Sequence, residues 1–417
     1  MNLSYFAVSN YRSCKKVNLN FKSNLGCLIG VNASGKTNIL SAILLLKKIC
    51  NSRLRFSNEK KEFSKCKVKA SLTDGDVLIE MSANIYFHTD ERNKDEVFDS
   101  ETRWRFSNFK PNQWHNIPID FFPFNDKDHL RVSPRMGLAL KRSKSVRGNV
   151  IKFIELLDNE DFNNNIIPLM NSVFNFFNNI NYYSATQFSN PSQCPISLEI
   201  EENRYRNRYN SSSKHSDFIF DLYNSCTRND KDFKRYLNTI SKEGIGLIDA
   251  IDFEKLEIPT STYEIQSGGE IIPISKERSL IVPLFTIDER KFSPNQLSEG
   301  TFKTLALLYY LMTDASSLLI VEEPEVCIHH GLLDSIVKLL VIQSKHKPIL
   351  ISTHSDLVLD QLEPENILHV EYIKKIGTSV KPLKNYLSMK DYSALKKYLK
   401  EYGNLGEYWK EGGLINA

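Results

Sequence analysis

The residues Gly30-Val-Asn-Ala-Ser-Gly35-Lys36-Thr37 decide the fold of this chain. They follow a short apolar segment, residues 26–30, and precede a longer one, residues 37–49. The first segment has the length of a buried strand, and the second has the length of a helix. A strand, a glycine-containing loop and a helix in this order indicate an α/β domain.

Each residue type in this loop suits the binding of a phosphate. The two glycines let backbone N–H groups close around phosphate oxygens, and the helix that follows adds the positive end of its dipole. The pattern G-x-x-x-x-G-K-[ST] assigns the ammonium of Lys36 to the β- and γ-phosphates and the hydroxyl of Thr37 to Mg²⁺. We therefore expect ATP and Mg²⁺ as cofactors. The candidate nucleotide-binding residues are Gly30, Asn32, Ala33, Ser34, Gly35, Lys36, Thr37 and Asn38.

Another apolar segment with the length of a strand, residues 317–321, is followed by Glu322-Glu323-Pro324-Glu325. Parallel sheets bind ligands at the carboxyl ends of their strands. We assign Glu322 to the metal ion and Glu323 to the attacking water as general base. A strand that only ends in solvated acids is the alternative, and the phosphate loop weighs against it.

A third apolar segment, residues 348–352, is followed by Thr353, His354 and Ser355. A histidine at the end of a strand can reach the γ-phosphate or the attacking water. His354 is therefore a candidate catalytic residue beside Lys36 and Glu323. A histidine in such a place would more often be structural if it stood alone.

The segment Leu297-Ser-Glu-Gly-Thr301 stands before a predicted helix, residues 301–312. Ser298 is a good N-cap, and Gly300 permits close approach of the backbone to an anion. A capped helix that binds no ligand explains the segment equally well from sequence alone.

These four motifs occur in the order of the ABC-type ATPases, and the chain resembles the RecF, SMC and OLD-like branch of that family. The resemblance covers residues 1–50 and 290–375 and includes Asn10-Tyr11-Arg12-Ser13. It implies an α/β ABC-ATPase (P-loop) head domain that forms a head-to-tail homodimer around two ATP molecules. Ser298 and Gly300 would then face the phosphate loop of the other subunit.

Two further residues enter through the resemblance. Gln187 resembles a Q-loop glutamine, since it follows a predicted strand, residues 180–185, and precedes an insertion; a surface amide is the alternative. Arg12 resembles arginines that touch phosphate in similar positions. Glu299, Thr301 and Glu322 depart from the commonest family spelling, but the OLD-like branch shares these features.

The tail Asn404-Leu-Gly-Glu-Tyr-Trp409 is similar to that of stand-alone ATPases of bacterial anti-phage systems, including Septu, PARIS and abortive-infection loci. The resemblance implies an ATP-driven switch subunit that controls a separately encoded effector such as a nuclease. A RecF-like repair ATPase that clamps duplex DNA is the alternative. A transporter subunit fits the motif spellings least.

The motifs also order the rest of the chain. We expect an ATPase domain over residues 1–375, with core lobes at 1–50 and 290–375, and a helical cap at 376–417. An antiparallel arm is expected near 55–110, where residues 68–87 have hairpin character. A partly helical insertion is expected near 190–285. The cap is too short for a nuclease domain with a core of its own.

The sequence also predicts local secondary structure between the two core lobes. We expect a helical stretch at 150–177, loops at 123–150 and 189–232, a helix at 231–241 and strands within 256–292.

Composition adds little about partners. The net charge of +4, from 54 basic and 50 acidic residues, predicts no nucleic-acid partner by itself. Seven cysteines without a C-x-x-C pair indicate reduced thiols and a cytoplasmic protein, and no apolar run has the length of a membrane span. Contact with DNA would need local basic patches, and the sequence has two candidates, although a solvated, flexible insertion is the favoured explanation of each. The first comprises Arg131, Arg135, Lys141, Arg142, Lys144 and Arg147, and the second comprises Arg204, Arg206 and Arg208 with Tyr205 and Tyr209.

Overall fold

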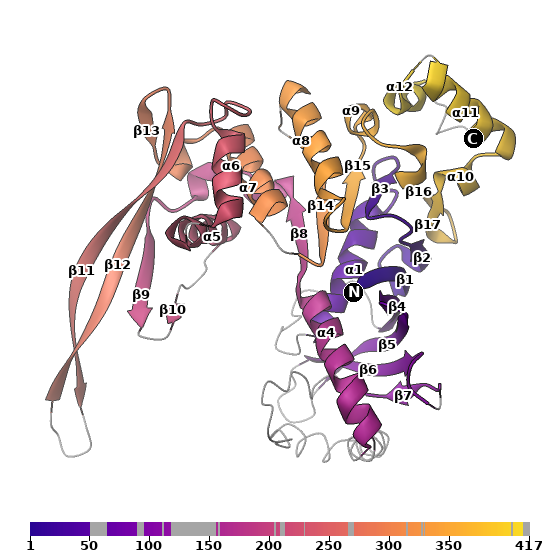
Figure 1. Ribbon diagram of the computed structural model, residues 1–417, viewed down its shortest axis with the longest axis horizontal. Coiled ribbons are helices and arrows are strands. Elements are labelled where there is room, and N and C mark those ends of the chain that lie inside the picture. The colour runs from indigo at the N-terminus through magenta and orange to yellow at the C-terminus, as the bar shows by residue number, and fades with distance from the viewer. Residues whose placement is uncertain are drawn as a thin grey trace. The chain divides into compact units, whose positions relative to one another are not determined.

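The computed structural model describes residues 1–50, 65–89, 96–110, 112–117, 156, 159–203, 206–208, 213–228, 230–265, 271–313, 316–326, 328, 330–401 and 403–411. The chain divides into two compact units (Figure 1). The first unit comprises Met1–Tyr182, Ala315–Glu322 and Ser344–Ala417. The second unit comprises Tyr183–Asp314 and Glu323–Gln343.

A mainly parallel sheet carries the motifs of the first unit. Its strand order is β17-β16-β3-β15-β14-β8. The strands β3 (Leu25–Ile29), β15 (Ile349–Thr353) and β14 (Leu318–Glu322) run parallel, and every residue of β14 and β15 is buried. Such continuous burial is typical of parallel strands that are covered on both faces. The remaining strands are β16 (Ile367–Ile373), β17 (Gly377–Pro382) and β8 (Ile180–Ser184).

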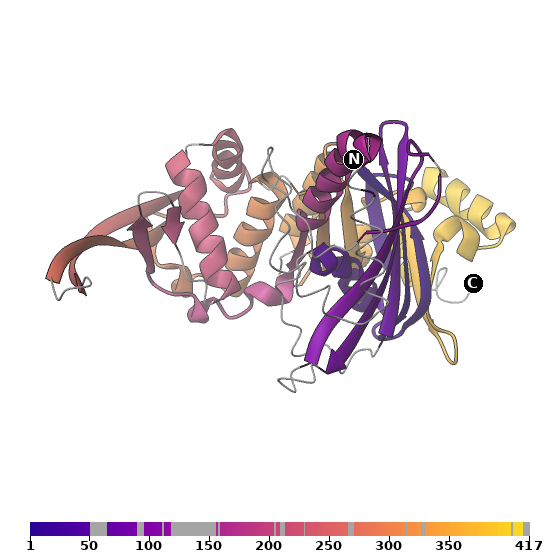
Figure 2. The ribbon, with the colours of Figure 1, turned by 90° about the horizontal axis from the view of Figure 1, so that it is seen from below.

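An antiparallel sheet lies beside helix α1 (Lys36–Cys50) in the same unit (Figure 2). In its strand β4, alternate side chains are buried, as the hairpin prediction for residues 68–87 requires. That prediction is confirmed, because β4 and β5 pair from Asp74↔Val77 outward. The sheet contains β2 (Cys14–Asn20), β1 (Asn2–Tyr11), β4 (Lys65–Asp74), β5 (Val77–Thr89), β6 (Glu96–Phe106) and β7 (His115–Asn116).

One apolar core joins the two sheets to α1 and α4 (Ile167–Asn178). A π-helical turn, Phe162–Ile166, leads into α4, whose Met170, Val173 and Phe177 are buried. The helical prediction for residues 150–177 is therefore confirmed from residue 162 onward. Residues 123–150 lie outside the described part of the chain.

The described part of the second unit contains a long antiparallel hairpin and four helices of ten or more residues. Strands β11 (Ala250–Ile265) and β12 (Ile271–Ile287) pair without interruption from Ala250↔Thr286 to Ile265↔Ile271, which confirms the predicted strands there. Figure 2 shows this hairpin reaching beyond the helices of its own unit. The other elements are β9 (Leu198–Asn203), β10 (Arg206–Arg208), β13 (Arg290–Phe292), α5 (Lys214–Arg228), α6 (Lys231–Ile240), α7 (Glu299–Thr313) and α8 (His330–Gln343).

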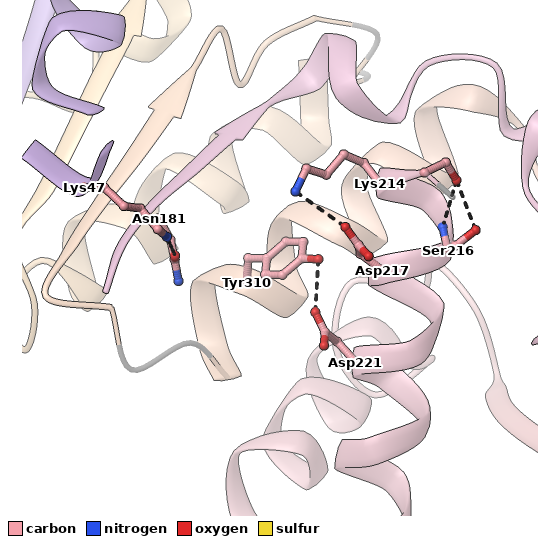
Figure 3. Close-up of polar contacts among 8 residues, drawn as sticks. Lys47, Asn181, Lys214, Ser216, Asp217, Asp221 and Tyr310 are labelled. Atoms are coloured by element: carbon pink, nitrogen blue, oxygen red, sulfur yellow. Dashed lines mark hydrogen bonds and ion pairs between the residues drawn. The ribbon is translucent and has the colours of Figure 1, made fainter. Parts of the chain in front are cut away.

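The prediction of an irregular loop over residues 189–232 is wrong for helix α5. Its composition is polar, but Phe218, Ile219 and Leu222 recur at helical spacing and are buried. The ring of Phe218 lies 5.5 Å from that of Phe302 on α7. Figure 3 shows the polar side of this packing, where the Tyr310 hydroxyl of α7 donates to the Asp221 carboxylate at 3.4 Å. Tertiary packing thus outweighs the polar composition.

The C-terminal residues begin with a strand and continue as helices. Strand β17 pairs antiparallel with β16 inside the parallel sheet, so the expected boundary at residue 375 falls between two paired strands. Helices α10 (Leu383–Tyr386), α11 (Met389–Glu401) and α12 (Leu405–Lys410) follow. The helical cap therefore starts at Leu383. Within the described ranges, none of the helices combines the length and apolar character that a bilayer span requires.

Candidate nucleotide-binding site

The loop between β3 and α1 needs its glycines for space. A Cβ atom on Gly30 would lie 2.2 Å from the carbonyl oxygen of Val370. Gly35 has a φ of +107°, and a Cβ there would lie 2.1 Å from the Thr378 hydroxyl oxygen. Ala33 also has a positive φ, +64°. The loop therefore curls tightly over the end of β3, as a phosphate-binding backbone must.

Lys36 lies inside this curl. Its side chain is only 6% exposed, and its ammonium donates to the carbonyl oxygens of Gly30 at 2.7 Å and Val31 at 3.3 Å. A buried ammonium needs partners of this kind, because unpaired burial of a charge is costly. The hydroxyl of Ser34 is also buried and has no hydrogen-bond partner among the described residues. A phosphate held by the loop would offer acceptors to both groups.

The two predicted metal ligands lie in direct contact. The Thr37 hydroxyl donates to Glu322 Oε1 at 2.5 Å, and Glu322 is 7% exposed at the end of β14. The described residues contain no cluster of three or more His, Cys, Asp or Glu side chains that could hold a metal. One hydroxyl and one carboxylate fit Mg²⁺ that shares its remaining ligands with phosphates and water. When bound, Mg²⁺ would polarise the phosphates.

Tyr182, which sequence reasoning missed, is a third member of this contact. Its hydroxyl, on strand β8, donates to the other carboxylate oxygen, Oε2, of Glu322. The sequence shows only a tyrosine within a predicted strand, which does not indicate this contact. Thr37 and Tyr182 thus hold different oxygens of the Glu322 carboxylate, and Tyr182 helps to orient it.

A chain of hydrogen bonds from Asn38 through Ser13 and Thr378 stabilises the phosphate loop. The Asn38 amide donates to Ser13 Oγ at 2.7 Å, and the Ser13 and Thr378 hydroxyls lie 2.7 Å apart. The Thr378 hydroxyl also lies 3.1 Å from the carbonyl oxygen of Ser34. Sequence reasoning missed both Ser13 and Thr378 as supports of the loop. Asn38 therefore stabilises the loop through Ser13.

Arg12 lies at the rim of the same site. Its backbone has a φ of +47°, and its guanidinium donates to Asn38 Oδ1 and Ser41 Oγ, both at 3.3 Å. The side chain is exposed. Its predicted contact with phosphate stays a prediction, but the structure brings it to the first turn of α1.

His354 belongs to the first unit and follows the last residue of β15. It is exposed, and the next residue, Ser355, donates its N–H to the Thr353 hydroxyl at 2.9 Å. The position at the carboxyl end of a central parallel strand agrees with the prediction. Its catalytic role remains a prediction.

Four candidate residues belong to the second unit: Gln187, Ser298, Gly300 and Glu323. Glu323 has a φ of +48°, a left-handed conformation that costs free energy in a residue other than glycine and is common at functional sites. Gln187 is half-buried in the 3-10 turn Ala185–Phe188, directly after β8. The proximity of these four residues to the phosphate loop remains a prediction.

The segment before α7 is a capped helix start, as predicted. Ser298 Oγ accepts the N–H of Thr301 at 3.1 Å. The unusual Glu299 pairs with Lys303 at 2.6 Å, and Lys303 is only 1% exposed. Glu299 therefore neutralises a buried ammonium on the next turn of the helix. The candidate basic patches lie outside the described residues, except that 206 and 208 have a described backbone.

Comparisons with known proteins identify the family of the chain. Residues 26–360 match a family described as an AAA domain, putative AbiEii toxin, Type IV TA system. The chain belongs to this AAA family. It is also 46% identical over 46 residues to the DNA replication and repair protein RecF of Lactobacillus acidophilus, a match that spans 11% of this chain and 12% of that protein.

Solved structures show the fold. An SMC head bound to the C-winged helix domain of ScpA is similar with a TM-score of 0.50 and 12% identity, over 94% of this chain and all of that one. The SMC head domain of Thermotoga maritima is similar with a TM-score of 0.43 and 10% identity, over 92% and 99%. The likeness to the ScpA-bound SMC head shows that the chain has the fold of an ABC-type ATPase head, as predicted.

Proposed function

We propose that this protein binds ATP with Mg²⁺ and hydrolyses it. The observation that carries the proposal is the Thr37–Glu322 contact, which joins the first turn of α1 to the end of β14 beside the buried Lys36. ATP supplies the phosphoryl group, and Mg²⁺ neutralises charge on its oxygens. Lys36 would hold the phosphates, and Thr37 and Glu322 would hold the metal. Glu323 would orient and deprotonate water, with His354 at the same end of the sheet as a further polar contact.

The test is steady-state ATP hydrolysis by purified variants. Lys36→Ala should lose ATP binding, whereas Glu323→Gln should bind ATP and hydrolyse it roughly 10²–10⁴-fold more slowly, the usual weight of a general base. Glu363→Gln, an exposed carboxylate of the first unit, is the control and should be unchanged. Hydrolysis at the wild-type rate by Glu323→Gln would remove the base assignment.

The proposal extends to a cytoplasmic switch in prokaryotic anti-phage defence. Two copies would close head to tail around ATP, with Ser298 and Gly300 of one chain facing the loop of the other. The closed dimer would hold or release a separately encoded effector such as a nuclease. The family description and the tail Asn404–Trp409 support this proposal.

Three measurements test the switch. Deletion of the gene with its native locus otherwise intact should abolish protection against phage, and unchanged plating counts against the proposal. Tagged Glu323→Gln with ATP should pull down a stoichiometric protein encoded beside it. Size-exclusion chromatography of the same variant should show a dimer with ATP and a monomer without it.

A repair ATPase that clamps duplex DNA is the second candidate. The 46-residue match to RecF favours it. It predicts that Glu323→Gln binds duplex DNA only with ATP and that the affinity falls steeply with salt. Absence of a mobility shift at low salt would remove this candidate.

A further inference from the structure

Helix α12 packs on the short helix that follows the His354 turn. Strand β15 ends at Thr353, His354 and Ser355 follow, and the short helix α9 (Asp356–Leu359) starts at once. Helices α9 and α12 lie side by side in the first unit (Figure 1). The contact with α12 thus begins at Asp356, two residues after the candidate catalytic histidine.

Gly406 is the point at which the backbone of α12 approaches Asp356 and Asp360 closely. Its N–H donates to Asp360 Oδ1 at 2.9 Å. A Cβ atom here would lie 2.3 Å from the Asp356 carbonyl oxygen and 2.3 Å from Asp360 Oδ1. The φ of Gly406 is outside the left-handed region, so the glycine is required for space and not for backbone conformation. Any side chain at this position must push α12 away from α9.

An ion pair also holds the two helices together. The ammonium of Lys410, at the end of α12, pairs with the Asp356 carboxylate at the start of α9. Leu405 of α12 is buried, as are Val358 and Leu359 of α9. The contact therefore combines an ion pair with a close backbone approach.

Helix α9 depends on such a partner. It has four residues, and a helix of one turn is unstable in water without tertiary contacts. Its own bonds are local: Leu359 N–H donates to Ser355 O at 3.4 Å, and Asp360 N–H donates to Asp356 O at 3.0 Å. The turn at His354 and Ser355 is thus held by β15 on one side and by α9 packed on α12 on the other.

We propose that α12 is a positioning element for His354, acting through the contacts of Gly406 with Asp360 and of Lys410 with Asp356. The proposal rests on the proposed ATP hydrolysis. Gly406 and Lys410 contact Asp360 and Asp356, so their role would be to fix the turn that carries His354. Displacement of α12 should lower the rate of hydrolysis while ATP still binds to the loop of Lys36.

The first experiment measures kcat and KM for ATP in Gly406→Ala and Lys410→Ala. The control is Lys400→Ala, which removes an exposed lysine of the neighbouring helix α11. Small displacements of a catalytic group are costly, so kcat should fall roughly tenfold in Gly406→Ala and several-fold in Lys410→Ala. KM should change less than twofold in all three variants. A kcat equal to that of the control in both test variants overturns the proposal.

A double-mutant cycle separates positioning from general destabilisation. In a His354→Ala background, the imidazole is absent and its placement no longer matters. Gly406→Ala should therefore reduce kcat no further in that background. If the two reductions multiply, α12 acts independently of His354 and the proposal fails.

If Gly406→Ala does not fold, exchange of the charges of Asp356 and Lys410 provides an alternative test. Asp356→Lys and Lys410→Asp should each lower kcat, and the double variant should recover most of it. Absence of recovery in a folded double variant counts against the ion pair as a positioning contact.

Hydrogen exchange provides a readout that needs no hydrolysis. Amides of residues 353–360 should exchange faster in Lys410→Ala than in Lys400→Ala, while those of α1 stay unchanged. A wild-type protein that binds ATP without hydrolysing it overturns the proposed function. If amide exchange in Lys410→Ala is then also the same as in Lys400→Ala, the contact of α12 with α9 does not stabilise the His354 turn. Active wild type with unaffected variants overturns only the role of α12.

Discussion

The Thr37 hydroxyl lies 2.5 Å from Glu322 Oε1, so the first turn of α1 meets the end of β14 across 285 positions of sequence. A hydroxyl that donates to a carboxylate will instead direct a lone pair to a metal ion when one binds. The contact would thus hold the two proposed ligands together before Mg²⁺ binds.

Replacing Thr37 tests this pair. Thr37→Ala removes the hydroxyl and should lower ATP hydrolysis by roughly 10²-fold, with a higher Mg²⁺ concentration needed for half of the maximal rate. Thr37→Ser keeps the hydroxyl and should stay within about threefold of wild type. The measurement is hydrolysis as a function of Mg²⁺ concentration at saturating ATP. Equal rates for the two variants would exclude the hydroxyl as a ligand.

Tyr182→Phe tests the orientation of Glu322. The variant loses one hydrogen bond to the buried carboxylate but keeps the ring. Loss of such a supporting partner typically weakens metal affinity about tenfold, so the half-saturating Mg²⁺ concentration should rise by that factor. The control is Tyr5→Phe, because the Tyr5 hydroxyl donates to Asn18 at 3.3 Å in an exposed hydrogen bond. An unchanged Mg²⁺ requirement in Tyr182→Phe would leave Thr37 as the sole contact that matters.

The parts of the candidate site that are contiguous in the sequence could be predicted from the sequence alone. Gly30–Thr37, Glu322 and His354 each follow an apolar strand, and the structure places these strands in one sheet. The pattern of each strand and the loop spelling are local, so no three-dimensional information was needed to find them. The same reason explains why α1 and the β11–β12 hairpin were predicted.

The supports of the site could not be found in this way. Tyr182 reaches Glu322 across 140 positions, and Ser13 reaches Thr378 across 365. Such contacts depend on strand order and register, which a polar residue in a single sequence does not reveal. Helix α5 was missed for a related reason, since only packing on Phe302 shows which of its residues are buried.

Glu299 and Lys303 make a prediction about stability. Glu299→Ala leaves the Lys303 ammonium buried without this carboxylate, which should lower the free energy of unfolding by about 2 kcal/mol; the partial exposure of Glu299, 37%, keeps the loss below that of a fully buried pair. Lys303→Met replaces the charge by an apolar chain of similar length and should cost about 1 kcal/mol or less. The measurement is the midpoint of urea unfolding.

The exposed pair Asp334 and Lys338 on α8 is a matched control, with the same spacing and 2.7 Å between the charged atoms. Asp334→Ala should change the free energy of unfolding by about 0.5 kcal/mol at most. If Glu299→Ala is no more destabilising than this control, Glu299 does not stabilise the buried lysine.

The Asp356–Lys410 pair predicts a specific pH dependence of stability. Burial alone would raise the pKa of Asp356, but the hydrogen bond and charge of Lys410 lower it overall. The hydrogen bond that Lys410 donates to Asp356 in turn raises the pKa of Lys410. A lowered carboxyl pKa stabilises the fold above the unfolded value, about 3.9, and this contribution is lost as the pH falls through the folded pKa. A raised ammonium pKa stabilises below about 10.4 and is lost as the pH rises through the folded value.

The difference in unfolding free energy between wild type and Lys410→Ala should therefore be constant between about pH 5 and pH 9 and shrink on either side. Urea unfolding at pH 3, 5, 7 and 9 measures it. Lys400→Ala should show no such window, because it removes an exposed lysine of the neighbouring helix. A difference that persists undiminished at pH 3 would mean that Lys410 stabilises through its aliphatic chain and not through its charge. In that case Lys410→Met should restore the wild-type free energy of unfolding, whereas a true ion pair would leave it low.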